Sequence, residues 1–327
     1  MESSLRGAFR MFVPMQLHLP SPIQQLVEPL YEKMGVQVFV KREDLIHPQI
    51  SGNKWRKLKY TLQKAAEKGK QHIVTFGGAY SNHVLATAVA AHALGLQASA
   101  IIRGEDQHNE VLNYCKSVGI KLHFVDRLSY TDKDECLARL FKGNTEIFVI
   151  PEGGASPEGV QGCEEILAEN TEIFDHIFCA AGTGTTASGL YSYIQKNKLN
   201  TILHVVPVLK NGDFIHNEMA KYISIKEQLE LHTSYHFGGY GKSTTELLRF
   251  IIRFYHRHQV LLDQVYTAKL VFGLHDLIGN GYFTRGSQIL WLHTGGLTGL
   301  HGVKTDLEQI DPNFTEVFSK NDPLQFK

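Results

Sequence analysis

The sequence of 327 residues is poor in cysteine and contains no long apolar run. Its four cysteines show neither a C-x-x-C motif nor metal-ligand spacing, so we expect buried thiols in a reducing compartment, without disulfides or zinc; they are Cys115, Cys136, Cys163 and Cys179. No run approaches the ~18 apolar residues that a membrane-spanning helix needs. The opening MESSLRGAFR lacks a continuous apolar core and is a poor secretory signal. These absences predict a cytoplasmic protein without a membrane partner.

Neither sign of charge is in excess. The chain has 33 Lys and Arg against 33 Asp and Glu, so its net charge gives no electrostatic reason to expect a nucleic-acid partner. None of the 17 histidines belongs to an H-E-x-x-H motif, and we expect surface or hydrogen-bonded histidines and no metal site. With 43% hydrophobic residues the chain can bury a sizeable core, and its length favours two lobes.

Strand and helix patterns alternate from residue 72 onward. Apolar runs predict strands at 72–78, 97–104, 121–127 and 147–151, and helical spacing predicts helices at 81–95, 108–119 and 131–142 between them. A stretch rich in glycine and proline at 151–162 breaks this rhythm, leads into a helix and precedes a second series, at 176–296. Repeated βα units predict the α/β class, with two open, mostly parallel twisted sheets, helices on both faces and a crevice between two domains.

One lysine follows a glycine-containing turn, in the segment Ser51-Gly52-Asn53-Lys54. A strand pattern at 36–40 precedes this turn, and apolar residues recur at helical spacing from Leu58, so Lys54 is expected at a helix N-terminus. The helix dipole disfavours a cation there, which favours the neutral amine and makes Schiff-base chemistry plausible. The alternative is a solvated basic face, made by Lys54, Arg56, Lys57 and Lys59.

A glycine-rich turn follows the strand pattern at 176–182. It reads Gly182-Thr183-Gly184-Thr185-Thr186, and its backbone N–H groups and hydroxyls suit a phosphate at the start of the next helix. The turn is neither G-x-x-x-x-G-K-[ST] nor a full G-x-G-x-x-G, so it matches neither of these nucleotide-binding motifs. A tight structural turn is the alternative.

Five motifs occur in a characteristic order: SGNKWRK, GGAYSNH, GTGTT, VYTAK and HTGG. This order resembles the pyridoxal-phosphate enzymes of the D-cysteine desulfhydrase and 1-aminocyclopropane-1-carboxylate (ACC) deaminase group, from residue 14 to residue 300. The resemblance implies the fold type II architecture of tryptophan synthase β-like enzymes, pyridoxal 5'-phosphate as cofactor, a small amino-acid substrate and a homodimer. It also implies a large domain at 1–54 and 165–327, and a small domain inserted at 55–164.

The resemblance assigns cofactor contacts to several residues. Lys54 would carry the cofactor as a Schiff base, and Lys57 would add a cationic contact to the phosphate bound by the turn at 182–186. Asn82 would bond the phenolic oxygen of the cofactor, and Thr294 would lie near its ring nitrogen.

The resemblance also assigns substrate contacts. Ser81, together with Asn82 and His83, would lie beside the substrate carboxylate, although serine and asparagine are also common helix N-caps. Tyr240 and Tyr266 match two family tyrosines that approach the substrate, one of which lies near the cofactor ring, although ordinary core packing is the alternative for both. Catalytic roles are therefore expected for Lys54, Ser81, Tyr240 and Tyr266. Either the freed Lys54 amine or Tyr266 is the candidate base for the α-proton.

Two positions separate the branches of this group. The deaminase pattern has an acidic residue after the second tyrosine (YEGK) and a leucine in HLGG, whereas Thr267 and Thr294 match the desulfhydrase pattern. A carboxylate would keep the pyridine nitrogen protonated and strengthen the electron sink, whereas a threonine hydroxyl only hydrogen-bonds it. Opening a cyclopropane requires the stronger sink. We therefore expect a D-cysteine desulfhydrase, with the D preference resting on the resemblance alone.

Three other functions compete. An ACC deaminase, which would release 2-oxobutyrate and ammonia, is the nearest alternative, and a non-catalytic pyridoxal-phosphate carrier is a remote one. A dinucleotide-dependent dehydrogenase would need a true G-x-G-x-x-G with an acidic residue ~20 positions beyond it, and this is absent. The sequence departs from the family pattern at Ala79, Tyr80 and Ala268, and Tyr80 could reshape the substrate pocket.

Overall fold

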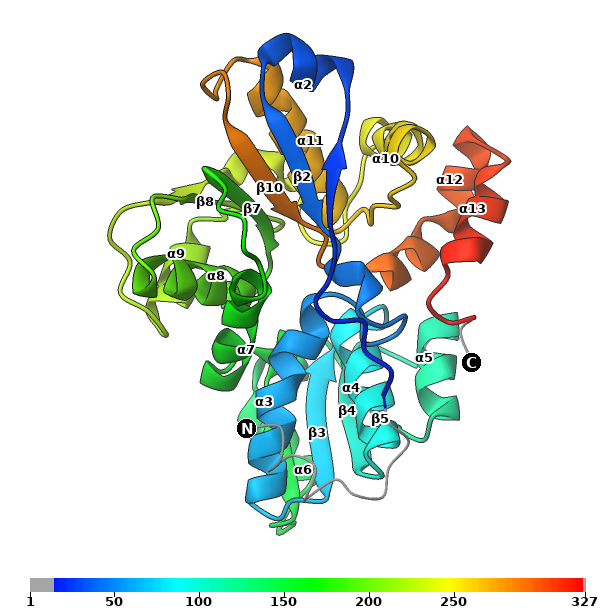
Figure 1. Ribbon diagram of the computed structural model, residues 1–327. Helices are drawn as coiled ribbons and strands as arrows, with labels where there is room; N and C mark the ends of the chain where they lie inside the picture. Colours follow the sequence, from blue (N-terminus) through cyan, green and yellow to red (C-terminus); the bar gives the residue numbers. More distant parts are fainter. Residues whose placement is uncertain (1–14, 107, 326–327) are drawn as a thin grey trace.

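Two β-sheets organise the chain into two lobes, as the computed structural model shows for residues 15–106 and 108–325 (Figure 1). The opening ten residues, where no signal peptide is expected, lie outside the described residues. The six-stranded sheet has the order β1 (Ile23–Leu26), β2 (Gln37–Lys41), β10 (Gln288–Leu292), β7 (His176–Ala181), β8 (Ile202–Pro207) and β9 (Leu229–Leu231). The four-stranded sheet has the order β5 (Lys121–Val125), β4 (Gln97–Arg103), β3 (His72–Gly77) and β6 (Ile147–Ile150).

Nearly all neighbouring strands run parallel. The exception is β1, which pairs with β2 in the antiparallel sense. The predicted α/β class with two mostly parallel sheets is confirmed. All strands of the smaller sheet lie between residues 55 and 164, and all strands of the larger sheet lie outside that range. The exact domain boundaries stay a prediction.

Helices cover both faces of the larger sheet because its strands are apolar on both sides. In β7, Ile177 and Cys179 pack into one core cluster with α7 and α8, whereas Phe178 and Ala180 pack on the opposite face against α10 and α11. The helices of this lobe are α2 (Pro29–Met34), α7 (Pro157–Ala168), α8 (Thr185–Lys196), α9 (Phe214–Ala220), α10 (Thr245–His258), α11 (Thr267–Gly279), α12 (Lys304–Ile310) and α13 (Phe314–Asn321).

The smaller sheet carries α3 (Asn53–Glu67), α4 (Asn82–Ala93), α5 (Glu110–Ser117) and α6 (Lys133–Leu140). Short 3-10 helices at Glu43–Leu45, Ser129–Thr131, Glu152–Gly154, Thr233–His236 and Leu297–Gly302 complete the described elements. The alanine-rich α4 is buried along most of its length between its own sheet and neighbouring helices. At its start Ser81 is the N-cap and accepts a hydrogen bond from the N–H of Val84.

The glycine-rich stretch at 151–162 differs from the predicted break, because α7 already begins inside it at Pro157. Ser156 caps this helix by accepting a hydrogen bond from the N–H of Gly159. A Cβ at Gly162 would lie only 1.8 Å from the carbonyl oxygen of Arg56, so glycine lets the α7 backbone touch the α3 backbone. The glycines of this stretch therefore serve close helix packing as well as a turn.

All four cysteines are buried free thiols, as expected from their scattered positions. The described residues after α13 pack on the smaller lobe (Figure 1), and Asp322 bonds His301, which also contacts Glu110 at the start of α5. Within the described residues, no helix combines the length and apolarity that crossing a bilayer requires.

Candidate active site

A cavity of about 670 Å³ lies between the two sheets, at the carboxyl ends of their parallel strands. Gly182 follows β7, Thr294 closely follows β10, and Gly78 follows β3. Loops leave parallel strands at this edge, so residues far apart in sequence converge there.

The cavity brings together every site residue that the sequence predicts in its motifs except Thr267. The lining includes Lys54, Lys57, Ser81, Asn82, His83, Gly182, Thr183, Gly184, Thr185, Thr186, Tyr240, Tyr266 and Thr294. Tyr80 is 40% exposed and is not among the lining residues.

Lys54 is the second residue of α3 and is held at the cavity by its neighbours. Gly52 has a φ of 64°, and a Cβ there would lie 1.9 Å from the carbonyl oxygen of Thr294, so only glycine permits this approach. The Lys54 Nζ donates to Asn53 Oδ1 at 2.5 Å. Burial, together with the nearby charge of Lys57, lowers the pKa of Lys54 to about 7. A large fraction of the amine is therefore neutral near pH 7.

The turn at 182–186 meets α3 directly. Asn53 Nδ2 donates to Thr186 Oγ1 at 2.8 Å, which joins the Lys54 segment to the start of α8. Gly184 adopts a φ of 72° before the first turn of α8, whose N–H groups have no intrahelical partners. Lys57 Nζ reaches the carbonyl oxygen of Gly153 at 3.1 Å and lines the same cavity. The turn thus offers an anion both backbone donors and a nearby cation.

His83 presents a buried ring nitrogen to the cavity wall. Thr75 Oγ1 donates to the carbonyl oxygen of Ile150 and lies 2.9 Å from His83 Nε2, so Nε2 carries the proton and donates to Thr75. Nδ1 is then an acceptor, and it has no partner within the described residues. Burial lowers the pKa of His83 to about 3, with the charges of Lys54 and Lys57 adding to this effect. The ring is therefore neutral at physiological pH.

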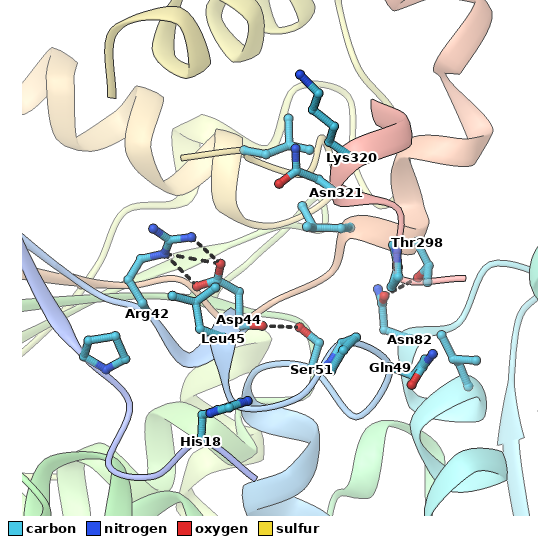
Figure 2. A pocket seen from close by; sticks show the side chains of 16 residues that line it. His18, Arg42, Asp44, Leu45, Gln49, Ser51, Asn82, Thr298, Lys320 and Asn321 are labelled. Carbon is cyan, nitrogen blue, oxygen red and sulfur yellow. Dashed lines mark hydrogen bonds and ion pairs between the residues drawn. The ribbon is translucent and has the colours of Figure 1, made fainter. Parts of the chain in front are cut away.

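Asn82 separates the candidate site from a second cavity of about 500 Å³. Figure 2 shows the Asn82 side chain bonded by the hydroxyl of Thr298. Its Nδ2 lies 3.4 Å from the carbonyl oxygen of Gly296. Asn82 begins α4 of the smaller lobe, and both partners belong to the larger lobe, so this residue also joins the two.

The two tyrosines meet across the cavity. Their rings are T-shaped, with centroids 6.1 Å apart. A Cβ at Gly182 would lie 3.4 Å from the Tyr266 hydroxyl, so the ring covers the start of the glycine-rich turn. Burial raises the pKa of Tyr266 well above its usual value, and its phenol therefore stays protonated.

Thr267 does not line the cavity, which corrects its expected place beside a cofactor ring. Its hydroxyl lies 2.8 Å from Asp263 Oδ1 inside the larger lobe, and its exposed fraction is 0%. Asp263 also accepts the backbone N–H groups of Val265, Tyr266 and Thr267. The hydroxyl is thus part of the turn that fixes Tyr266, and Thr294 alone of the threonine pair faces the cavity.

Sequence reasoning missed several residues of the wall on the smaller lobe. They are Arg103, Arg127, Tyr130, Thr131, Lys133 and Glu152. Arg103 ends β4 and Glu152 lies just beyond β6, so the convergence of strand carboxyl ends was a signal for both. Lys133 Nζ lies 3.4 Å from Glu152 and 2.9 Å from the centroid of the Tyr130 ring.

These residues fit an aldehyde cofactor that carries a phosphate. The depressed pKa of Lys54 supplies a nucleophilic amine, and the N–H groups at the start of α8 can hold a phosphate. The unpartnered Nδ1 of His83 leaves an acceptor for a ligand donor. A lysine, an anion cradle and aromatic walls in one cavity are what pyridoxal phosphate requires.

Comparisons with known proteins agree with this geometry. A "Putative 1-aminocyclopropane-1-carboxylate deaminase" of Pyrococcus horikoshii is 34% identical over 298 residues, which cover 85% of this chain and 90% of that protein. A "D-cysteine desulfhydrase" of Yersinia enterocolitica is 28% identical, over 86% of this chain and 92% of that protein. The "Bifunctional D-cysteine desulfhydrase/1-aminocyclopropane-1-carboxylate deaminase, mitochondrial" of Arabidopsis thaliana is 27% identical, over 92% of this chain and 82% of that protein.

Solved structures give the same picture. A crystal structure described as an ACC deaminase homologue superimposes with a TM-score of 0.78 at 31% identity, covering 95% of this chain and 100% of that one. A fungal L-serine ammonia-lyase from Rhizomucor miehei has a TM-score of 0.65 at 16% identity over 86% of this chain and 94% of that one, and shares the fold. The family described as "Pyridoxal-phosphate dependent enzyme" matches residues 15–295. The chain therefore belongs to the pyridoxal-phosphate dependent enzymes, within the group of ACC deaminase and D-cysteine desulfhydrase homologues.

Proposed function

We propose that the enzyme is a D-cysteine desulfhydrase, which converts D-cysteine to pyruvate, hydrogen sulfide and ammonia. The observation that carries the proposal is the chemistry of the wall around Thr294. Among the described lining residues the only carboxylate is Glu152, and it faces Lys133 on the smaller lobe. A hydroxyl at Thr294, on a cavity wall whose one described lining carboxylate faces Lys133, favours a neutral cofactor ring, which suffices to expel a good leaving group such as hydrosulfide.

Bound pyridoxal phosphate would supply an electron sink for the carbanion formed at the substrate α-carbon. The chain's own residues divide the remaining work. Lys54, neutral in a large fraction near pH 7, takes the α-proton, whereas Tyr266 stays protonated and acts as a donor. The electron pair left at the α-carbon forms a double bond to the β-carbon as the C–S bond breaks and hydrosulfide leaves. Hydrolysis of the resulting enamine gives pyruvate and ammonia.

Binding roles follow the positions of the side chains. We assign the phosphate to Lys57 and the turn at 182–186, and the substrate carboxylate to Ser81, Asn82 and the N–H groups that begin α4. His83 supports this wall as a neutral acceptor, and Tyr240 closes the substrate side near Tyr266. The proposal includes a cytoplasmic homodimer, whose dimeric state analytical ultracentrifugation can test.

An ACC deaminase is the second candidate function. It is favoured by the Pyrococcus and Thermotoga relatives, which are named putative ACC deaminases and are 33–34% identical to this chain. The two candidates differ in product, because ACC yields 2-oxobutyrate and D-cysteine yields pyruvate and sulfide.

The test offers the purified holoenzyme D-cysteine, L-cysteine and ACC, and measures sulfide, pyruvate and 2-oxobutyrate. We expect rapid release of sulfide and pyruvate from D-cysteine and little 2-oxobutyrate from ACC. Because Thr267 is bonded to Asp263, Thr294 is the position to change. Thr294→Leu should lower the desulfhydrase rate, and Thr294→Ser, which keeps the hydroxyl, should restore it. Turnover of ACC faster than D-cysteine by the unmodified enzyme contradicts the proposal.

A further inference from the structure

Three potential metal ligands converge on one face of the larger sheet, outside the candidate active site. His204 lies on β8, Glu230 lies on β9, and His232 follows β9 directly. His204 and Glu230 are register partners on neighbouring parallel strands, and His232 is two residues beyond Glu230. Side chains two residues apart emerge on the same face of a strand, so the three groups share one face.

The separations of their ligand atoms match the size of a metal ion. His204 Nδ1 lies 2.9 Å from His232 Nε2 and 3.3 Å from Glu230 Oε2, and the latter two atoms are 3.8 Å apart. A circle through three points with these separations has a radius of about 2.0 Å, which is the usual length of a Zn–N or Zn–O bond. One ion near the centre of the triangle therefore contacts all three atoms without any side chain moving.

Surrounding groups hold these ligands in place. The His204 ring stacks on Phe178 with centroids 4.3 Å apart and planes 5° from parallel. Its Nε2 lies 3.0 Å from His176 Nδ1; when Nε2–H donates to His176, Nδ1 offers its lone pair to an ion. The hydroxyl of Tyr282 donates to the Glu230 carboxylate. Hydrogen bonds of this kind orient and tune metal ligands.

The access also suits a metal. The Glu230 side chain is 38% exposed, which gives an ion a path from solvent. Two imidazoles and one carboxylate suit zinc and its neighbours in the first transition row, whereas calcium and magnesium prefer oxygen ligands alone.

We propose that His204, Glu230 and His232 form a binding site for one divalent ion of the zinc class per chain. The ion fastens β9, a three-residue strand at the edge of the sheet, to β8. The site is structural, because it lies far from the candidate active site. His176, which contacts the ligand His204, begins β7, and the turn at 182–186 starts six residues later, about 20 Å away at ~3.3 Å per residue. Sequence spacing gave no hint of it, since the ligands come from two strands.

The other described group of three such residues provides an internal comparison. In that group Glu110 contacts His301 Nδ1 and Asp322 lies 3.0 Å from His301 Nε2. The two nitrogens of one imidazole point away from each other, so these contacts cannot converge on a single ion. Glu110→Gln is therefore a control that removes an acidic neighbour of a histidine without affecting the proposed site.

The experiment titrates ZnCl₂ into holoenzyme that has been freed of metals with EDTA and desalted. Calorimetry should show one saturable Zn²⁺ site per chain, and excess Zn²⁺ should raise Tm by about 5 °C. His232→Gln and Glu230→Gln each remove a ligand on the accessible side and should abolish both effects. Tyr282→Phe removes only an outer hydrogen bond and should weaken binding about tenfold.

Two controls separate this site from nonspecific binding. His216→Gln changes an exposed histidine on α9, and it should bind Zn²⁺ like the unmodified enzyme, as should Glu110→Gln. Turnover should be unchanged in His232→Gln, because the site lies far from the cavity. If no saturable binding occurs, or if His232→Gln and Glu230→Gln retain it, the three histidines from His176 to His232 form only a chain of hydrogen bonds and the metal site does not exist.

Discussion

A buried ion pair next to Lys54 offers a sharp test of how the smaller lobe is anchored. Arg56 and Glu43 are both 0% exposed, and Arg56 Nε and Nη2 each donate to Glu43 at 2.9 Å. Arg56 also forms two hydrogen bonds with Glu169, at the end of α7. Because Arg56 is two residues beyond Lys54 on α3, these bonds fix the segment that presents the reactive amine.

Glu43→Gln replaces a carboxylate oxygen by an amide donor facing the guanidinium. Breaking a buried pair by changing one partner costs about 3–5 kcal/mol, and we expect the lower end because Glu169 still neutralises Arg56. A loss of about 3 kcal/mol should lower Tm by about 4 °C in a chain of this length. Thermal and urea unfolding of the apoenzyme measure both quantities.

The matched control is Glu165→Gln. Glu165 pairs with Lys59 and lies 3.8 Å from Arg56, but its side chain is 24% exposed, so the same substitution should cost less than about 1 kcal/mol. Glu43→Leu combined with Arg56→Met should recover most of the stability, since it leaves no buried charge of that pair. Equal losses for Glu43→Gln and Glu165→Gln would refute the view that burial makes the Glu43 pair the stronger anchor.

Three further predictions concern the cofactor site. Lys54→Ala should lose the absorbance band near ~410 nm and the borohydride-reducible bond to pyridoxal phosphate, whereas Lys59→Ala should keep both. A reducible bond in Lys54→Ala would identify another lysine as the anchor. Gly184→Ala and Gly143→Ala both strain a glycine with a φ of 72°, but only Gly184→Ala should weaken cofactor affinity, by about tenfold or more. Fluorescence titration measures this affinity, and equal affinities in the two variants would place the phosphate elsewhere. Because burial lowers the pKa of Lys54 from 10.5 to about 7, the unfolded chain binds more protons than the folded apoenzyme between these values. Apoenzyme stability from urea midpoints should therefore gain a contribution that increases with pH through this window, and Lys54→Met should remove it; identical pH profiles contradict the lowered pKa.

The sequence predicted the fold class because its strand patterns are short, apolar and regularly spaced. The strand expected at 72–78 is observed at His72–Gly77, and the turn at 182–186 indeed joins β7 to α8. The helix start at Pro157 was hidden because glycine signals a break in a sequence, whereas Gly162 permits contact between helix backbones. Close backbone packing depends on a partner about 100 residues away, and no local pattern reveals it.

The same limit explains which site residues were found. Lys54 and the glycine-rich turn carry their chemistry in contiguous motifs, so the sequence placed them at the cavity. Arg103 and Glu152 have no such motif, and their positions depend on where β4 and β6 end. A residue outside a motif reaches a site only through the topology, which a periodic pattern describes too coarsely.

Thr267 shows how a correct motif can still mislead about a side chain. Its position after Tyr266 suggested a contact with the cofactor ring, but the segment from Asp263 to Thr267 is also a helix-capping turn, in which one carboxylate accepts three backbone N–H groups. The Thr267 hydroxyl bonds that carboxylate, and the buried turn holds the backbone of Tyr266 in place. A glutamate at Thr267 would bring a second carboxylate against Asp263, so it would disturb the turn before it could reach a cofactor. The choice between the desulfhydrase and the deaminase therefore depends on Thr294, the one threonine of the pair whose side chain borders the cavity.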